Sequence, residues 1–207
     1  MAEKRMPWNR PSGSTLPIRQ GDYAAEPIYT ALGKALSAWE GTNAAANSLH
    51  RSLHAFLDQT DHGAATNVFD GLLKTHDRAQ HIRQLAATFL AADFGERRDE
   101  AAKVKKKLNS ALASYVGWAA WSNELSHSYV TSAQCPDYHQ DEQPIITVFA
   151  LLPSHARIDR WHHAEPEWNY LADEIRAFAN QFSSLDDVFE GLAGTIAELG
   201  TFRTAAT

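Results

Sequence analysis

The sequence is short of the features that mark several common protein classes. Its 207 residues include one cysteine, Cys135, which cannot form a disulfide within its own chain. Because no signal peptide is evident either, we expect a reducing, cytoplasmic setting. No stretch approaches the roughly 20 consecutive apolar residues of a membrane-spanning helix. We therefore expect a soluble protein with no membrane contact.

Positive charge is also scarce. Lysine and arginine number 19 against 25 aspartates and glutamates, which gives a net charge of −6. A protein with this balance does not attract nucleic acid through its overall field, so any such contact needs a local basic patch. Glycine-rich phosphate loops, Cys-x-x-Cys pairs and serine or cysteine nucleophile motifs are absent as well, and the sequence predicts no cofactor.

The chain has long helical periodicity instead. Apolar residues recur every three or four positions and predict helices over residues 27–58, 64–75, 78–93 and 97–130, with a further helical region after Pro166. Within that last region Ser184, Gly191 and Gly194 favour an interrupted helix over one continuous rod.

A short β-branched segment separates the last two helical regions. Residues 145–152, IITVFALL, are bounded by prolines, so we expect a strand to which residues 157–163 pair back, after a loop over residues 132–143. The fold class is therefore mainly α: a helical bundle of about four or five helices with a small two-stranded β ribbon before the last helical region. Residues 1–22 are expected to form a flexible N-terminal arm, and residues 23–207 a single helical domain.

The helix expected over residues 97–130 carries polar groups beside aromatic ones. Asn123 and His127 are four residues apart, so they lie on adjacent turns of one face. Trp118, Trp121 and Leu125 form an apolar stripe on another side. We interpret this stripe as a self-association face and predict a homodimer, because two-fold dimers are the commonest assembly.

The run Ser122-Asn123-Glu124-Leu125-Ser126-His127 resembles the motif of HEPN-superfamily proteins, which are helical bundles. Their motif is an arginine, a polar residue that is often asparagine, a short spacer and a histidine. The resemblance implies a metal-independent endoribonuclease that pairs two motif copies across a dimer. His127 would act as acid or base on a 2′-hydroxyl or leaving oxygen, with Asn123 orienting it. The layout also resembles a group of bacterial helical proteins that keep an Arg-Asn-x-x-x-His version.

The sequence departs from that motif at its first position, where Ser122 stands in place of the arginine. Serine cannot supply the cationic fork that stabilises a phosphorane-like charge. We therefore expect a HEPN-like, catalytically degenerate protein that binds a protein or nucleic-acid partner in a defence or stress role. Two alternatives stay open: an endoribonuclease that uses His127 with a cation from elsewhere, such as Arg157 or Arg160, and a structural scaffold without ligand.

A purely structural interpretation of the motif also stays open. Asn123 and His127 would then be a hydrogen-bonded polar pair near a helix interface, since buried polar groups normally find partners. The basic residues of the same helix have two interpretations as well. Lys103, Lys106 and Lys107 are candidates for nucleic-acid contact, although a solvated helix face with ion pairs is the default for such a run.

Histidines also recur in the first helix, where His50, His54 and Asp58 are spaced at four-residue intervals. Two histidines one turn apart can bind zinc if other ligands approach. No further ligand is evident from the sequence, so we interpret the trio as a solvated or rim face and predict no metal site.

Overall fold

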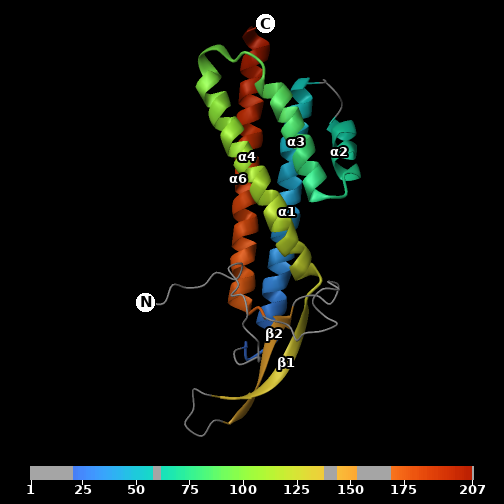
Figure 1. Cartoon of the computed structure of the whole chain (residues 1–207), viewed down its shortest axis with the longest axis vertical. Coiled ribbons are helices and arrows are strands. Elements are labelled where there is room, and N and C mark those ends of the chain that lie inside the picture. Colours follow the sequence, from blue (N-terminus) through green and yellow to red (C-terminus); the bar gives the residue numbers. More distant parts are fainter. Residues whose placement is uncertain (1–20, 58–61, 138–143, 153–168, 207) are drawn as a thin grey trace. The chain divides into compact units, whose positions relative to one another are not determined.

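The computed structural model describes residues 21–57, 62–137, 144–152 and 169–206, which Figure 1 colours along the chain. Their elements in chain order are α1 Glu26–Leu57, α2 His62–Gly71, α3 Thr75–Leu90, the 3₁₀ turn Gly95–Arg97, α4 Arg98–Ser126, β1 Tyr129–Pro136, β2 Ile145–Leu152 and α6 Ala172–Ala206. The predicted fold class is confirmed: the chain is mainly helical, with a two-stranded antiparallel sheet before the last helix. Among the described helices, none is long and apolar enough to span a membrane.

The ribbon is built from different segments than predicted. β1 pairs with β2 in antiparallel register, with Tyr129 opposite Leu152 and Pro136 opposite Ile145. The expected loop is therefore strand as far as Pro136, and the helix expected to reach Val130 ends at Ser126. Tyr129, Val130 and Thr131 are aromatic or β-branched and favour a strand, which overrides the helical spacing. The predicted partner, residues 157–163, lies outside the described residues.

α6 is one continuous helix of 35 residues, whereas the sequence favoured an interruption. Each interior glycine disfavours a helix by about 1 kcal/mol relative to alanine. Burial of the apolar face outweighs that cost, because most helical stability in proteins comes from tertiary packing. The buried residues that line this face are Phe182, Leu185, Phe189, Leu192, Ile196 and Leu199.

The start of α3 also differs from the prediction in detail. The helix begins at Thr75, and Lys74 occupies the N-cap position without a side-chain cap hydrogen bond. Asp77, near which the sequence placed the start, lies inside the first turn. There its carboxylate is close to the positive end of the helix dipole, which stabilises a helix that begins near this residue.

The chain divides into two compact units. The first consists of the described residues through Ala38 and of Trp121–Gln181. Asp22 and Phe149 exchange backbone hydrogen bonds of 2.8 Å, and the Asp22 carboxylate accepts the N–H of Ala172 at 2.8 Å. That carboxylate caps the start of α6. Asp22 is thus docked, although it belongs to the expected flexible arm; residues 1–20 lie outside the described residues.

A buried polar contact joins three elements of the first unit. The Tyr170 hydroxyl donates to the Glu124 carboxylate at 2.6 Å, and both residues are buried. Tyr170 also exchanges backbone hydrogen bonds of 2.8 and 2.9 Å with Leu151 of β2. Its ring meets Phe178 of α6 edge-on, at 5.7 Å between centroids. Glu124, a residue inside the motif, therefore takes part in holding this unit together.

The second unit consists of Trp39–Ala120 and of α6 from Phe182 onward. Trp39 is buried and stacks on Tyr115 of α4 at 5.4 Å between ring centroids. The Tyr115 hydroxyl donates to Asn43 at 2.6 Å. Gly200 lets α6 pass close to α1, because a Cβ atom there would lie 2.5 Å from the Phe56 ring.

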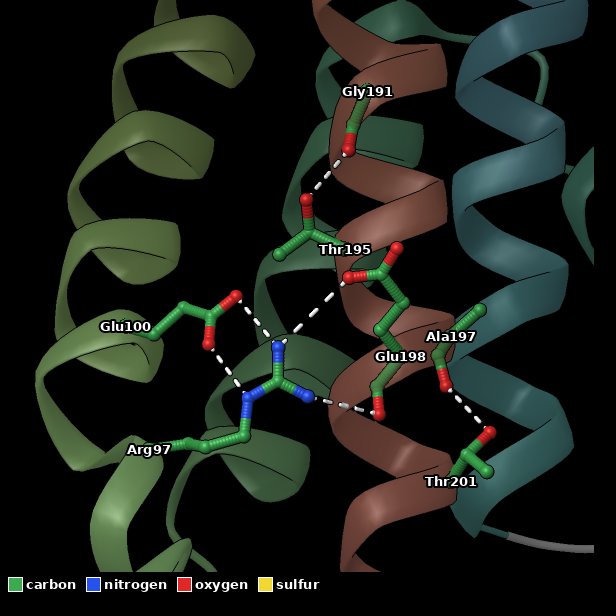
Figure 2. Close-up of polar contacts among 7 residues, drawn as sticks. All are labelled: Arg97, Glu100, Gly191, Thr195, Ala197, Glu198 and Thr201. Atoms are coloured by element: carbon green, nitrogen blue, oxygen red, sulfur yellow. Dashed lines mark hydrogen bonds and ion pairs between the residues drawn. The ribbon is translucent and has the colours of Figure 1, made fainter.

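An ion pair ties the 3₁₀ turn to its neighbours in the second unit, as Figure 2 shows. Arg97 makes two 2.7 Å hydrogen bonds to the Glu100 carboxylate. It also donates to the backbone oxygen of Glu198 at 3.3 Å. The Glu100 bonds raise the pKa of Arg97, and the Arg97 guanidinium lowers the pKa of Glu100. Exposed pairs of this kind contribute little stability.

Candidate metal centre

The motif residues Asn123 and His127 lie at the end of α4 and just beyond it, and both are exposed. The buried members of the motif are Ser122 and Glu124. Asn123 and His127 are therefore not buried, and their interpretation as a hydrogen-bonded polar pair near a helix interface stays a prediction. Their catalytic role stays a prediction. The candidate replacement cations at positions 157 and 160 lie outside the described residues.

The candidate lysines Lys103, Lys106 and Lys107 are all exposed on α4. The Lys107 ammonium group lies 3.9 Å from the point where a Cβ atom on Gly191 would stand, so this side chain lies against α6. Exposure is compatible both with a solvated face and with phosphate contact. Nucleic-acid binding by these lysines stays a prediction.

The apolar stripe that nominated a self-association face packs inside the chain. Leu125 is buried, Trp118 meets Phe182 at 6.1 Å between ring centroids, and Trp121 meets Phe178 at 5.5 Å. Both tryptophans therefore contact α6 and remain half-buried. The homodimer, and the part of this stripe in it, stay predictions.

Three histidines converge in the second unit, where α1 faces α3. His50 and His54 lie one turn apart on α1, and His81 comes from α3. The ring centroids are separated by 4.6 Å for His50 and His54, 5.0 Å for His50 and His81, and 5.9 Å for His54 and His81. One ring nitrogen from each histidine lies within 4.8 Å of those of the other two. We call these three residues the histidine triad.

The sequence suggested a solvated or rim face for these histidines, but the structure places them largely in the interior. His50 is completely buried, and His54 and His81 are half-buried. Position 50 belongs to the inward stripe of α1, since it adjoins buried Leu49 and Leu53. Both ring nitrogens of His50, and Nε2 of His81, are buried without a hydrogen-bond partner. Asp58, the third residue of the sequence pattern, lies outside the described residues.

Burial favours the neutral, metal-binding form of two triad members, His50 and His81. Desolvation lowers the pKa of His50 from 6.5 to about 4, with smaller contributions from the charges of His54 and His81. The pKa of His81 is lowered as well, first by burial and then by His54. Both rings are therefore neutral at pH 7. A neutral imidazole has a lone pair to donate to a metal, whereas a protonated one has none.

The groups around the triad are aromatic and polar. The Phe69 ring of α2 lies 5.3 Å from the His50 ring, and the guanidinium of Arg78 lies 4.9 Å from the Phe69 centroid. Arg78 is held by a 2.7 Å hydrogen bond to the Leu72 oxygen. Asn47 stands one turn before His50 on α1, and its Oδ1 is buried without a hydrogen-bond partner.

The spacing of the triad fits a transition metal after a small adjustment. Zinc binds imidazole nitrogen at about 2.0–2.1 Å, which places two nitrogens of a tetrahedral site about 3.4 Å apart. Because the three nitrogens lie within 4.8 Å of one another, they must approach by at most about 1.4 Å, and rotation about the broad χ2 torsion of histidine allows such a change. No cysteine, aspartate or glutamate of the described residues belongs to this group of three histidines.

No protein-family model, curated protein or solved structure matches the chain. The HEPN resemblance accordingly rests on the short motif, and the functional argument rests on the chemistry of the triad.

Sequence reasoning missed His81. The spacing of His50 and His54 was visible, but the third ligand comes from another helix, and its approach depends on how α1 and α3 are rotated about their axes. The available signal was weak: His81 immediately precedes Ile82 on the apolar side of α3, so it lies at the edge of that helix's buried face.

A pocket of about 490 Å³ lies elsewhere and is lined by Phe94, Arg98 and Lys105 among others. It includes no candidate residue, and we assign it no role.

Proposed function

We propose that this protein binds a divalent transition metal through the histidine triad. The observation that carries the proposal is the convergence of three ligand nitrogens within 4.8 Å of one another around a fully buried His50. Histidine is the commonest metal-ligating side chain. Two ligands one turn apart on one helix and a third on a neighbouring helix form a compact facial set.

The alternative, that the triad is ordinary core packing, is costly. Buried side-chain nitrogens and oxygens normally have hydrogen-bond partners, and leaving one without a partner costs about 1–3 kcal/mol. His50 carries two such nitrogens. A metal ion removes part of this cost, because it takes up the lone pair of one ring nitrogen, which no donor in the described chain satisfies.

The donor set favours particular metals. Imidazole nitrogens suit zinc, copper, nickel and iron, whereas calcium and magnesium prefer oxygen ligands. The triad offers nitrogen alone among the described residues. We therefore propose zinc or nickel as the first ions to test, with calcium and magnesium as ions that should not compete.

Isothermal titration of the EDTA-stripped, dialysed full chain with zinc or nickel chloride tests the proposal. We expect one equivalent to bind, and His81→Ala to weaken binding by at least about tenfold. His76→Ala is the matched control, because His76 is exposed in the first turn of the same helix. Equal affinities for wild type and His81→Ala would refute the site, provided that circular dichroism shows the variant to be folded.

A second candidate function follows from the exposure of Asn123 and His127. We propose, as a separate possibility, that this end of α4 is a HEPN-like surface for a protein or nucleic-acid partner in a cytoplasmic homodimer. The supporting observation is that both side chains are exposed and so accessible to a partner. Ser122 is buried, so it contributes neither charge nor contact at this surface.

Cleavage of labelled RNA in EDTA tests the enzymatic version of this second proposal. If His127 supplies acid or base chemistry, wild type cleaves in EDTA and His127→Ala does not. His76→Ala again serves as the control. If neither the wild type nor His127→Ala cleaves the RNA, partner binding is the remaining version of the proposal. Crosslinking at position 127 then tests it.

A further inference from the structure

We infer that a metal held by the histidine triad keeps one exchangeable coordination position, which takes hydroxide or another small anion. The inference rests on the proposed metal binding and adds what the site does with its fourth ligand. It is drawn from the number of ligands, their charge and the groups that adjoin them.

The ligand count is the first argument. Structural zinc sites have four protein ligands, whereas sites with three protein ligands keep water or substrate in the fourth position. The described chain brings three histidines together, and no cysteine, aspartate or glutamate of that part completes the set.

The charge of the ligands is the second argument. Three neutral imidazoles leave a divalent ion with its full charge next to the buried His50 and the Phe69 ring. An isolated charge in such surroundings is costly unless an opposite charge accompanies it. A metal ion lowers the pKa of its bound water toward 7, so hydroxide is available near neutral pH to supply the negative charge.

The adjoining polar groups are the third argument. Asn47 precedes His50 by one turn on the same face of α1, and its Oδ1 is buried without a hydrogen-bond partner. An acceptor in that place is satisfied by the proton of a metal-bound water.

Cobalt substitution separates this inference from the proposed function. The full chain is loaded with Co²⁺, and its visible absorption is followed while sodium azide is added at pH 7.5. Tetrahedral Co²⁺ absorbs visible light strongly, and its bands shift when a ligand is exchanged. We expect a saturable azide-dependent shift. We also expect Asn47→Leu to bind azide at least threefold more tightly, because the competing water loses its acceptor, and exposed Asn109→Leu to match wild type.

The outcomes are distinct. A protein that takes up no Co²⁺ contradicts the proposed metal binding itself. Uptake with visible bands that azide leaves unchanged overturns the exchangeable position. An Asp58→Asn variant that responds to azide where wild type does not would show that the chain fills the fourth position, which also overturns the inference. An azide affinity of Asn47→Leu equal to that of wild type and of Asn109→Leu overturns the part assigned to Asn47.

Discussion

Replacing His50 by leucine separates the cost of burying this imidazole from its use as a ligand. In the metal-free protein the two ring nitrogens have no hydrogen-bond partner, a defect of about 1–3 kcal/mol. Leucine removes the polar atoms and fills a similar volume. It forfeits the ring contact with Phe69, worth about 0.5–1.5 kcal/mol. We therefore expect His50→Leu to raise the free energy of unfolding of the metal-free chain by about 1 kcal/mol.

Zinc should reverse the order of stability of the wild type and His50→Leu. At a free zinc concentration 100 times the Kd, a ligand that binds only the folded state stabilises it by about 2.7 kcal/mol. For a chain of this size, 1 kcal/mol shifts Tm by about 2–4 °C, so the wild type should gain about 5–11 °C. His50→Leu should gain little, because it has lost a ligand. The variant is thus the more stable protein in EDTA and the less stable one in zinc.

Differential scanning calorimetry in EDTA and in zinc measures both effects. His76→Leu is the matched control: the histidine it replaces is exposed, so its stability should change by less than about 0.5 kcal/mol and its zinc response should persist. Two results would refute the reasoning. His50→Leu could be clearly destabilised in EDTA, which would mean that the imidazole is well satisfied without metal. Alternatively, it could keep the full zinc response.

Three further predictions concern stability. The pKa of folded His50 is lowered to about 4, so below pH 6.5 the unfolded chain binds a proton that the folded chain does not bind. Urea unfolding should therefore show that the free energy of unfolding falls by up to about 3 kcal/mol between pH 6.5 and 4. The fall should be smaller in His50→Leu. Gly200→Ala should lower Tm, because its Cβ would press on the phenylalanine ring of α1, whereas Gly194→Ala, with open space around it, should gain up to about 1 kcal/mol. Tyr170→Phe should cost about 1–3 kcal/mol in denaturant unfolding, because buried Glu124 loses a 2.6 Å hydrogen bond, and an unchanged value would contradict the structural role given to that contact.

The helices were predictable because their signal is local. A stripe of apolar residues at helical spacing specifies which side of α1, α4 or α6 is buried, whatever lies opposite. The ribbon was harder, because a strand's partner is not encoded in the strand itself. β2 was recognisable from its β-branched residues, but β1 carries Ser132 and Gln134 and was expected to be a loop at those positions. Only the pairing with β2 makes it a strand.

The triad shows the same limit at a functional site. The spacing of His50 and His54 was visible in the sequence, and the position of His50 beside Leu49 and Leu53 could have indicated burial. What could not be derived was the rotation of α3 that brings His81 against them. Ligands on one helix follow from its period, whereas a ligand on a second helix follows from packing that involves the whole unit.

The polar groups in the interior differ in a way that supports a function for the triad. Elsewhere in the part of the chain that the structure describes, such groups are paired: the Thr42 hydroxyl donates to the Phe182 oxygen at 2.9 Å, and Tyr115 donates to Asn43 at 2.6 Å. Among the described residues, Asn47, His50 and His81 have buried side-chain atoms without a hydrogen-bond partner, and all three belong to the triad or precede it by one helical turn. A core that satisfies its polar groups elsewhere and leaves neighbouring ones unsatisfied loses stability there. Proteins accept such local losses at functional sites, and a metal with an exchangeable ligand accounts for the histidines and the asparagine together.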